Sequence, residues 1–438
     1  MLVRTKNTKI YERACKVIAG GLLSNFKKEA GSQPVYVKSV NGARVTDFDG
    51  KEYIDCALSL GPVILGHSNK NYKEALKAQI DKMYSGEFSI IQIEAAEKIQ
   101  ELIPSAELIR YSVSGSEAVF NAIRVARGYT GKNMCVKFNG QYHGGLDYIL
   151  GGIVEDPENP VVIEGEKEED LYSMVCSTEG RGRDTLSNCY MVEWNDPDAL
   201  EKLFKAKSDD IACVVMEPIM MNVGGCTPEP GYLEGVRALC TKYNVVLIFD
   251  ETLTGFRLGL NGAQGYFGVT PDMSTFAKAV GGGFPVSLYC GKKEIMDSIT
   301  NTRVLAMGTY NGHPVAAAAL LATVAELEKD GAIERINRLG NMMKEGFKAA
   351  AKKHGISLRM QGMSGAWFPV FTDKDKIINH KDAIENADIM KSAAFAGMMK
   401  QRGVLNNFRF CTSAAHTEED IQLVIEKADS VLADMANM

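Results

Sequence analysis

Short apolar runs alternate with longer amphipathic stretches between about residues 66 and 310. Three of these runs, Met134–Phe138, Ala212–Met216 and Val245–Phe249, have the largely unbroken apolar character of strands buried on both faces of a parallel sheet. Helices that alternate with such strands form βαβ units. The pattern therefore predicts an α/β fold whose large domain, residues 66–310, holds a mostly parallel, doubly wound sheet.

The residues before this region have a different pattern. Apolar positions within residues 8–19 follow the spacing of an amphipathic helix, which two glycines end. Asn-Gly and Asp-Gly pairs then separate three short strand patterns, at residues 34–37, 42–48 and 52–55. We therefore expect a helix and a small antiparallel meander in an N-terminal segment, residues 1–65.

The residues after position 310 predict a second, smaller α/β domain, residues 311–438. It should contain an alanine-rich helix, a weak strand and a closing amphipathic helix, at residues 314–329, 366–371 and 418–435. We expect segment 1–65 to join it, so that the small domain is built from both termini. The acidic stretch 155–170 is expected to be a solvated insertion loop.

Length and charge narrow the class of protein. A chain of 438 residues implies two or three domains. The formal net charge is -6 and the basic residues are dispersed, which argues against nucleic acid and membrane surfaces as partners. The apolar stretch Val315–Val324 is too short to cross a bilayer, and the first residues lack the apolar core of a signal peptide. We therefore expect an enzyme that acts on small molecules.

The positions of the cysteines and histidines indicate a cellular compartment and argue against a metal site. The ten cysteines occur singly, with no C-x-x-C pair, and several fall inside apolar patterns. This usage is typical of reduced core residues and a cytoplasmic location. The six histidines form no metal-ligand spacing, so no metal site is predicted.

Two residues carry the strongest chemical signal. Asp250 ends the apolar run from Val245, and Lys278 lies 28 residues later, just before three glycines. Ligands of open α/β sheets collect at the carboxyl ends of the strands. A lysine amine can form a Schiff base with an aldehyde cofactor, and a carboxylate can keep a pyridine nitrogen protonated. The pair indicates a pyridoxal 5'-phosphate (PLP) enzyme, while a capping acid and a solvated lysine are the ordinary alternatives.

A helix start supplies a candidate phosphate site. Ser114, Gly115 and Ser116 open a predicted helix, where free N–H groups and the helix dipole favour an anion. Ser114 and Glu117 also form a capping-box pattern, which most helices have without binding a ligand. The phosphate site is therefore supported only in combination with the other groups.

Further groups follow the other strand ends. Tyr142 and His143 come after the Met134 strand, where an aromatic ring could stack on a flat heterocycle or simply pack. Glu217 ends the Ala212 strand, Asn222 follows it, and Thr309 stands beside a glycine in a later loop. Each is ordinary alone, but together they would deliver an aromatic, acids, an amine and phosphate donors to one edge.

A nucleotide-binding module without PLP is the alternative from another class. The glycines at 281–283 could belong to a phosphate loop. They do not complete a G-x-G-x-x-G after a strand, and this alternative gives Lys278 no role. The sequence favours the PLP enzyme.

With these residues the chain resembles the class III (fold type I) PLP-dependent aminotransferases, and within them the glutamate-1-semialdehyde aminomutase group. The matching segments extend over nearly the whole chain. They are Asp49–Asp55, Gly61–His67, Ser114–Ala118, Tyr142–Gly144, Phe249–Arg257, Gly281–Pro285, Gly308–Thr309 and Ala414–Asp420.

The resemblance implies a role for each residue singled out above. Lys278 would form the Schiff base and move the proton during transamination, Asp250 would face the pyridine nitrogen and Tyr142 would stack on the ring. It also implies a homodimer with shared active sites, in which Thr309 reaches the phosphate of the neighbouring subunit. The remaining implied cofactor contacts are Ser114, Gly115, Ser116, His143, Asn222 and, one layer behind, Glu217.

Departures from the aminomutase pattern fall where the substrate is chosen. Lys27 stands in place of an arginine that binds the substrate carboxylate, and Leu60 in place of a tryptophan. A shortened C-terminal loop lacks its acidic residue and carries Arg409. We therefore expect an aminotransferase that uses an amino acid or amino-bearing metabolite and a keto or aldehyde acceptor. An intramolecular aminomutase and a racemase or epimerase are the alternatives.

Overall fold

The computed structural model describes residues 5–25, 33–150, 188–329 and 331–438. Its centre is a seven-stranded sheet in which β10 runs antiparallel to both neighbours and the strands from β9 to β6 run parallel. In spatial order the strands are β4 (Leu108–Ser112), β10 (Ser287–Gly291), β9 (Met273–Phe276), β8 (Val246–Asp250), β7 (Ile211–Met216), β5 (Met134–Phe138) and β6 (Cys189–Val192).

Helices cover both faces of this sheet. Alternate residues of β8 belong to two different apolar clusters, because successive side chains of a strand point to opposite faces. One cluster includes residues of α5 (Pro197–Lys207) and α6 (Tyr232–Lys242), and the other residues of α4 (Gly115–Thr130) and α8 (Lys293–Thr300). The predicted doubly wound α/β fold is thus confirmed.

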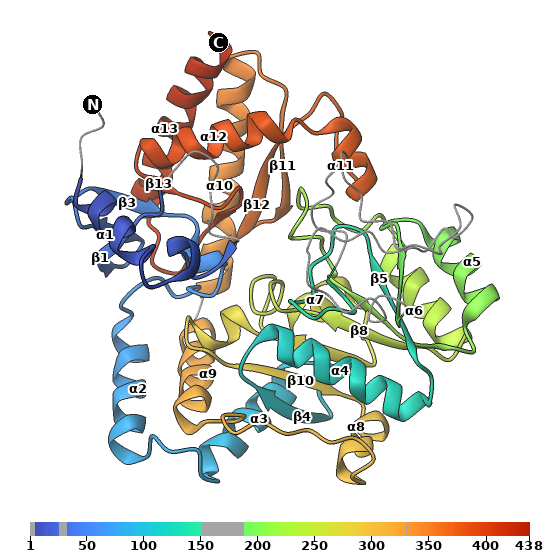
Figure 1. The fold of residues 1–438 in the computed structure, drawn as a ribbon. Coiled ribbons are helices and arrows are strands. Elements are labelled where there is room, and N and C mark those ends of the chain that lie inside the picture. The colour runs from blue at the N-terminus through green and yellow to red at the C-terminus, as the bar shows by residue number, and fades with distance from the viewer. Residues whose placement is uncertain (1–4, 26–32, 151–187, 330) are drawn as a thin grey trace.

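A second group of helices packs at the β10 end of the sheet. The alanine-rich α9 (Pro314–Leu327) lies against α2 (Lys70–Lys82) and α3 (Ile90–Leu102). The short α7 (Gly262–Phe267) follows β8. The helix α9 belongs to the predicted C-terminal domain but packs with elements of the large sheet (Figure 1). The division at residues 65 and 310 stays a prediction.

The smaller α/β part combines both ends of the chain. The first strands, β1 (Val37–Asn41), β2 (Arg44–Asp47) and β3 (Glu52–Asp55), form a sheet with β13 (Val404–Leu405). The C-terminal part also supplies a three-stranded sheet and its helices. They are β11 (Leu358–Met363), β12 (Ala366–Phe371), β14 (Phe410–Cys411), α10 (Ala332–Lys353), α11 (His380–Asn386), α12 (Ile389–Gln401) and α13 (Glu418–Ala436).

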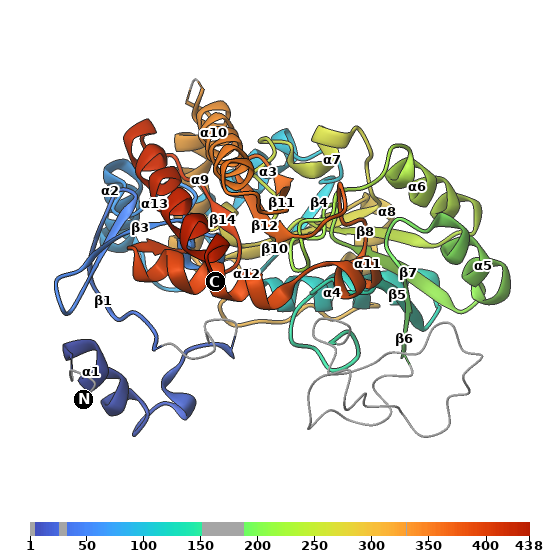
Figure 2. The same ribbon diagram turned by 90° about the horizontal axis from the view of Figure 1, so that it is seen from above.

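Both views of the ribbon show these two ends together. The N-terminal strands lie beside α12 and α13, at the opposite end of the molecule from α5 and α6 (Figures 1 and 2). Parallel pairing of β3 with β13 fixes this contact. That segment 1–65 and residues 311–438 form one small domain stays a prediction.

Element boundaries differ from the sequence expectation mainly near the N-terminus. The first helix is α1 (Lys6–Ala14), which ends before residue 19. The first strand begins at Val37, so the pattern at 34–37 was placed too early. The acidic stretch 155–170 and Cys176 lie outside the described residues.

Three features of composition can be checked on the described residues. All nine described cysteines are unpaired thiols, and all but Cys15 are buried. No group of three or more histidine, cysteine, aspartate or glutamate side chains in this part of the chain could hold a metal ion. None of its helices is both long enough and apolar enough to span a membrane.

Candidate active site

The predicted groups meet at the carboxyl edge of the large sheet. Asp250 is the last residue of β8, Tyr142 and His143 follow β5, and Lys278 follows β9. They open on a cavity of about 330 Å³ between the strand ends and the start of α4. Its walls are Pro62, Val113, Ser114, Gly115, Ser116, Tyr142, His143, Gly144, Asp250, Thr252, Ala277, Lys278, Gly283, Phe284, Pro285 and Val286.

Asp250 is a buried carboxylate held by three groups. Its Oδ2 lies 2.8 Å from Nδ1 of the buried His143, while Oδ1 accepts from the Thr252 N–H at 3.0 Å and the Thr275 hydroxyl at 3.2 Å. Burial raises the pKa of Asp250, but His143 and the hydrogen bonds with Thr252 lower it more, so the net pKa is below the usual value. The carboxyl is therefore ionised at neutral pH.

Lys278 stands on a strained backbone. It begins a short 3-10 turn, Lys278–Gly281, with φ of 50°, a left-handed conformation that is rare for residues with a side chain. Burial and the nearby cation of Arg409 lower the pKa of Lys278 to about 8, against the opposing charges of Asp250 and Glu217. A large fraction of the amine is therefore neutral, and nucleophilic, at mildly alkaline pH.

The start of α4 lines the cavity, and its use as a phosphate site stays a prediction. Ser114 is the N-cap residue, and its hydroxyl accepts from the Glu117 N–H at 3.3 Å. The Glu117 carboxylate accepts from the Val113 N–H instead of the Ser114 N–H, so the reciprocal half of the expected capping box is absent at this helix. Opposite, Gly144 approaches closely, since an added Cβ would lie 2.7 Å from the Ser116 Cα.

Glu217 lies behind the aromatic wall and outside the cavity. Its carboxylate accepts hydrogen bonds from the Tyr142 N–H at 2.9 Å, the Met221 N–H at 2.8 Å and the Asn222 amide at 2.7 Å. Burial raises the pKa of Glu217, and the charge of His143 offsets part of this rise. These contacts fix the backbone of Tyr142 and the side chain of Asn222, and the position of Glu217 one layer behind a cofactor stays a prediction.

Arg409 lies close to Lys278 but does not line the cavity. It is 7% exposed, and its guanidinium donates to the carbonyls of Met221 at 2.9 Å and Leu60 at 3.1 Å. Its Nε is buried with no partner among the described residues. The half-buried Leu60 meets this arginine through its backbone oxygen.

A second buried arginine was missed by the sequence reasoning. Arg257 donates to the carbonyls of Gly61, Gly365 and Thr412 and has no carboxylate partner in the described part of the chain. A Cβ on Gly61 would lie 3.9 Å from a guanidinium nitrogen of Arg257 and of Arg409, so both cations flank this residue. The motif that contains Arg257 was noted, but nothing in it signals burial.

Besides Glu217, Asn222, Leu60 and Arg409, two more predicted residues are not placed in the cavity. Thr309 is exposed and lies on the surface near Gly86, whose added Cβ would be 3.6 Å from the Thr309 carbonyl oxygen. Lys27 lies outside the described residues. Conversely, the cavity includes Val113, Thr252 and Phe284, which sequence reasoning did not select. Thr252 could have been found from its place two residues after Asp250.

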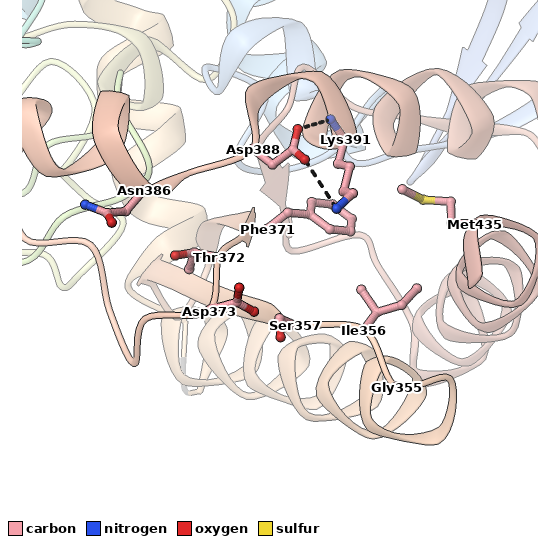
Figure 3. A pocket seen from close by; sticks show the side chains of 10 residues that line it. All are labelled: Gly355, Ile356, Ser357, Phe371, Thr372, Asp373, Asn386, Asp388, Lys391 and Met435. Carbon is pink, nitrogen blue, oxygen red and sulfur yellow. Dashed lines mark hydrogen bonds and ion pairs between the residues drawn. The ribbon is translucent and has the colours of Figure 1, made fainter. Parts of the chain in front are cut away.

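Another cavity, of about 410 Å³, lies in the smaller part and shares no residue with the first (Figure 3). Two of its charged residues, Asp388 and Lys391, are paired with each other. The Asp388 carboxylate caps α12 by accepting from the Lys391 N–H at 2.8 Å, and the Lys391 Nζ lies 3.3 Å from the same carboxylate. This hollow therefore offers no free reactive group comparable with Lys278.

Known proteins were compared with the chain. The family description "Aminotransferase class-III" matches residues 26–432. A curated relative, glutamate-1-semialdehyde 2,1-aminomutase 2 of Bacillus pumilus, is 37% identical over 440 residues, 97% of each chain.

Solved structures give the same picture. An omega-transaminase from Sphaerobacter thermophilus is 26% identical, with a TM-score of 0.91 over 99% of this chain and 98% of that one. A glutamate-1-semialdehyde aminomutase from Pseudomonas aeruginosa shares the fold, with a TM-score of 0.86 at 23% identity over 98% and 94% of the two chains. On this family match and this identity, the chain belongs to the class III aminotransferases, a family whose cofactor is pyridoxal phosphate.

Proposed function

We propose that this protein is a PLP-dependent aminotransferase. It would move an amino group between an amino acid or amino-bearing metabolite and a keto or aldehyde acceptor. The observation that carries the proposal is one cavity that holds the Lys278 amine, the ionised Asp250 and the start of α4. The three groups match the aldehyde, the pyridine nitrogen and the phosphate of PLP.

The described residues fit this cofactor. The Nδ1 atom of His143 is hydrogen-bonded to Asp250. Two other buried atoms, Nε2 of His143 and the hydroxyl oxygen of Thr252, have no hydrogen-bond partner within the described residues. Such buried polar atoms usually find a partner, which a bound group can supply. Ser114, Gly115 and Ser116 would hold the phosphate, and Tyr142 would lie on the ring.

Each side chain then has a defined part in the chemistry. PLP, when bound, supplies an electron sink for the carbon next to the transferred amino group. Asp250 would hold the pyridine nitrogen in its protonated form, because its carboxyl is ionised. Lys278 would hold the cofactor through its amine and, with a pKa of about 8, could accept and return a proton during the reaction. Glu217 holds the loop of Tyr142 and Asn222.

An intramolecular aminomutase is the second candidate, favoured by the 37% identical relative from Bacillus pumilus. Against it stand Leu60 and Lys27, which replace residues of the aminomutase pattern, and Arg409 in the shortened loop. A racemase or epimerase would use the same Lys278 and Asp250. An aminotransferase needs a second substrate, whereas an aminomutase and a racemase or epimerase do not.

We further propose that the active form is a homodimer in which Thr309 completes the partner's phosphate site. Thr309 is exposed and lies outside the cavity of its own chain. Large apolar side chains of the adjoining segments are exposed as well, which is typical of an interface. They are Tyr84, Phe88, Ile90, Ile93, Leu305, Met307 and Tyr310.

The first prediction tests the cofactor and the reaction together. Borohydride treatment of the PLP-loaded protein should fix the cofactor to the peptide that contains Lys278, and Lys278→Ala should carry no such label. With a panel of amino donors, product beyond one equivalent per site should form only when a keto or aldehyde acceptor is added. Label on another lysine would refute the site. Turnover of one substrate without an acceptor would refute the aminotransferase and favour the mutase or racemase.

The second prediction concerns Asp250→Asn. The change removes the charge that holds the ring proton but keeps the shape of the side chain, so turnover should fall at least ~10²-fold. Thr275→Val, which removes only a neutral hydrogen bond to Asp250, is the matched control and should cost much less. Steady-state kinetics at saturating PLP make the comparison. Near-normal turnover of the asparagine variant would contradict the assigned role.

The third prediction concerns Arg409→Ala. If a substrate carboxylate meets this cation, KM for a carboxylate substrate should rise by the equivalent of about 1.5 to 3 kcal/mol, and KM for a neutral amine should change little. The ratio of the two effects matters, because loss of the Leu60 and Met221 contacts would alter both substrates alike. Equal effects would place carboxylate recognition elsewhere.

The fourth prediction tests the shared site. Lys278→Ala and Thr309→Ala are each expected to be weakly active alone. Mixed under exchange conditions, they should regain activity, because a heterodimer contains one site with both native residues. Sedimentation of the native protein should give a dimer. A fully active monomer, or a mixture no more active than its parts, would overturn this arrangement.

A further inference from the structure

A third cavity lies where the large and small parts of the molecule meet. Its volume is about 460 Å³, and it shares no residue with the cavity of Lys278. The loop at 227–229 forms one wall, while α10, β11 and the loop at 375–377 form the others. Four of the side chains that line it are cationic: Lys344, Lys348, Arg359 and Lys376.

Three of these cations face a carboxylate. Lys376 pairs with Glu229 at 2.5 Å, and Arg359 approaches Asp375 and Lys348 approaches Glu345, each at 3.8 Å. The latter two pairs are long and lie at the surface, so they are readily exchanged for another anion.

Lys344 is different from its neighbours. It is half-buried, and no carboxylate oxygen of the described chain lies within 4.0 Å of its Nζ, which donates to the Gly362 carbonyl at 3.0 Å. Burial lowers the pKa of Lys344 to about 8, although the charge of Glu345 opposes the change. A desolvated lysine amine of this kind is the usual nucleophile toward carbonyl compounds.

We propose that Lys344 is a second covalent site of this protein, which captures small anionic aldehydes as reversible imines. The neutral Nζ attacks the aldehyde carbon, the oxygen leaves as water, and a carbon–nitrogen double bond replaces the carbonyl. No oxidant or reductant is required. Arg359 holds the anionic group of the ligand, since it lines the same cavity and can release its distant carboxylate.

The size and charge of the cavity define the ligand class. A volume of about 460 Å³ admits a single aromatic ring or a short chain with one carboxylate or phosphate. The carboxylates of Glu229, Glu345 and Asp375 in its walls disfavour larger polyanions. This site does not depend on the reaction at Lys278.

The test uses the intact protein with its PLP first fixed by borohydride and excess reagent removed. The protein is then exposed at pH 8 to 4-carboxybenzaldehyde with cyanoborohydride, and the labelled lysines are identified by peptide mass spectrometry. Lys348, one turn further along the exposed face of α10, is the internal control. Burial lowers the pKa of Lys344 to about 8, so about half of its amine is neutral at this pH, and label on Lys344 should exceed that on the exposed Lys348 by about tenfold or more.

A neutral aldehyde and two variants separate nucleophilicity from anion binding. With 4-methylbenzaldehyde the preference for Lys344 should shrink, and inorganic phosphate should suppress only the reaction of the carboxylated probe. Arg359→Met should act like the neutral aldehyde, and Lys344→Arg should abolish the label while keeping the charge.

Three results would overturn the proposal. They are equal labelling of Lys344 and Lys348 in the native protein, equal reaction with both aldehydes, and no effect of phosphate. The first comparison is made within one folded protein, so it does not depend on how well a variant folds. Failure to fix PLP on Lys278 would count against the aminotransferase and leave the ratio at Lys344 to be judged separately.

Discussion

The buried carboxylate of Asp250 is the constraint on which the rest of the site depends. An ionised acid inside a protein is costly unless hydrogen bonds replace water. Here the partners come from three places, since His143 follows β5, Thr252 follows β8 itself and Thr275 lies on β9. The order of these strands in the sheet therefore determines whether the acid stays ionised. The same order brings Lys278, which follows β9, to the edge of the cavity.

Charge balance around Lys278 is the next constraint. Burial is the largest cause of the lowered pKa of this lysine; the charges of Arg409 and Arg257 lower it further, while those of Asp250 and Glu217 raise it. Because both arginines bind only backbone carbonyls among the described residues, their charge is not neutralised by a fixed carboxylate. An unpaired buried cation is unfavourable, and an anionic guest relieves that cost. For this reason we propose a substrate carboxylate as a further partner of Arg409.

Much of this arrangement could be predicted from local sequence. The strands of residues 134–138 and 246–250, the N-cap Ser114 and the strand-end Asp250 follow from apolar runs and helix-start chemistry, which act over a few residues. The Glu117 carboxylate accepts from the N–H of Val113 and not from that of Ser114. This choice was not predictable, because the two N–H groups belong to adjacent residues and one side chain can reach either. The packing of α9 on α2 and α3 was not predicted either, since the sequence of an alanine-rich helix does not indicate which surface the helix will cover.

The turn that leads into Pro62, a residue of the cavity wall, was beyond local patterns for a further reason. Leu58, Ser59, Leu60 and Gly61 all have positive φ, between 48° and 111°. Such a run of left-handed residues costs roughly 1 to 2 kcal/mol for each residue with a side chain, so long-range contacts must hold it. Arg257 binds the Gly61 carbonyl, and Arg409 binds that of Leu60. Burial is the main cause of the lowered pKa of Lys278, and these same two cations lower it further, so the turn and the lysine depend on the same arginines. A substitution that displaces either arginine by reshaping residues 58–61 is therefore expected to raise the pKa of Lys278 as well.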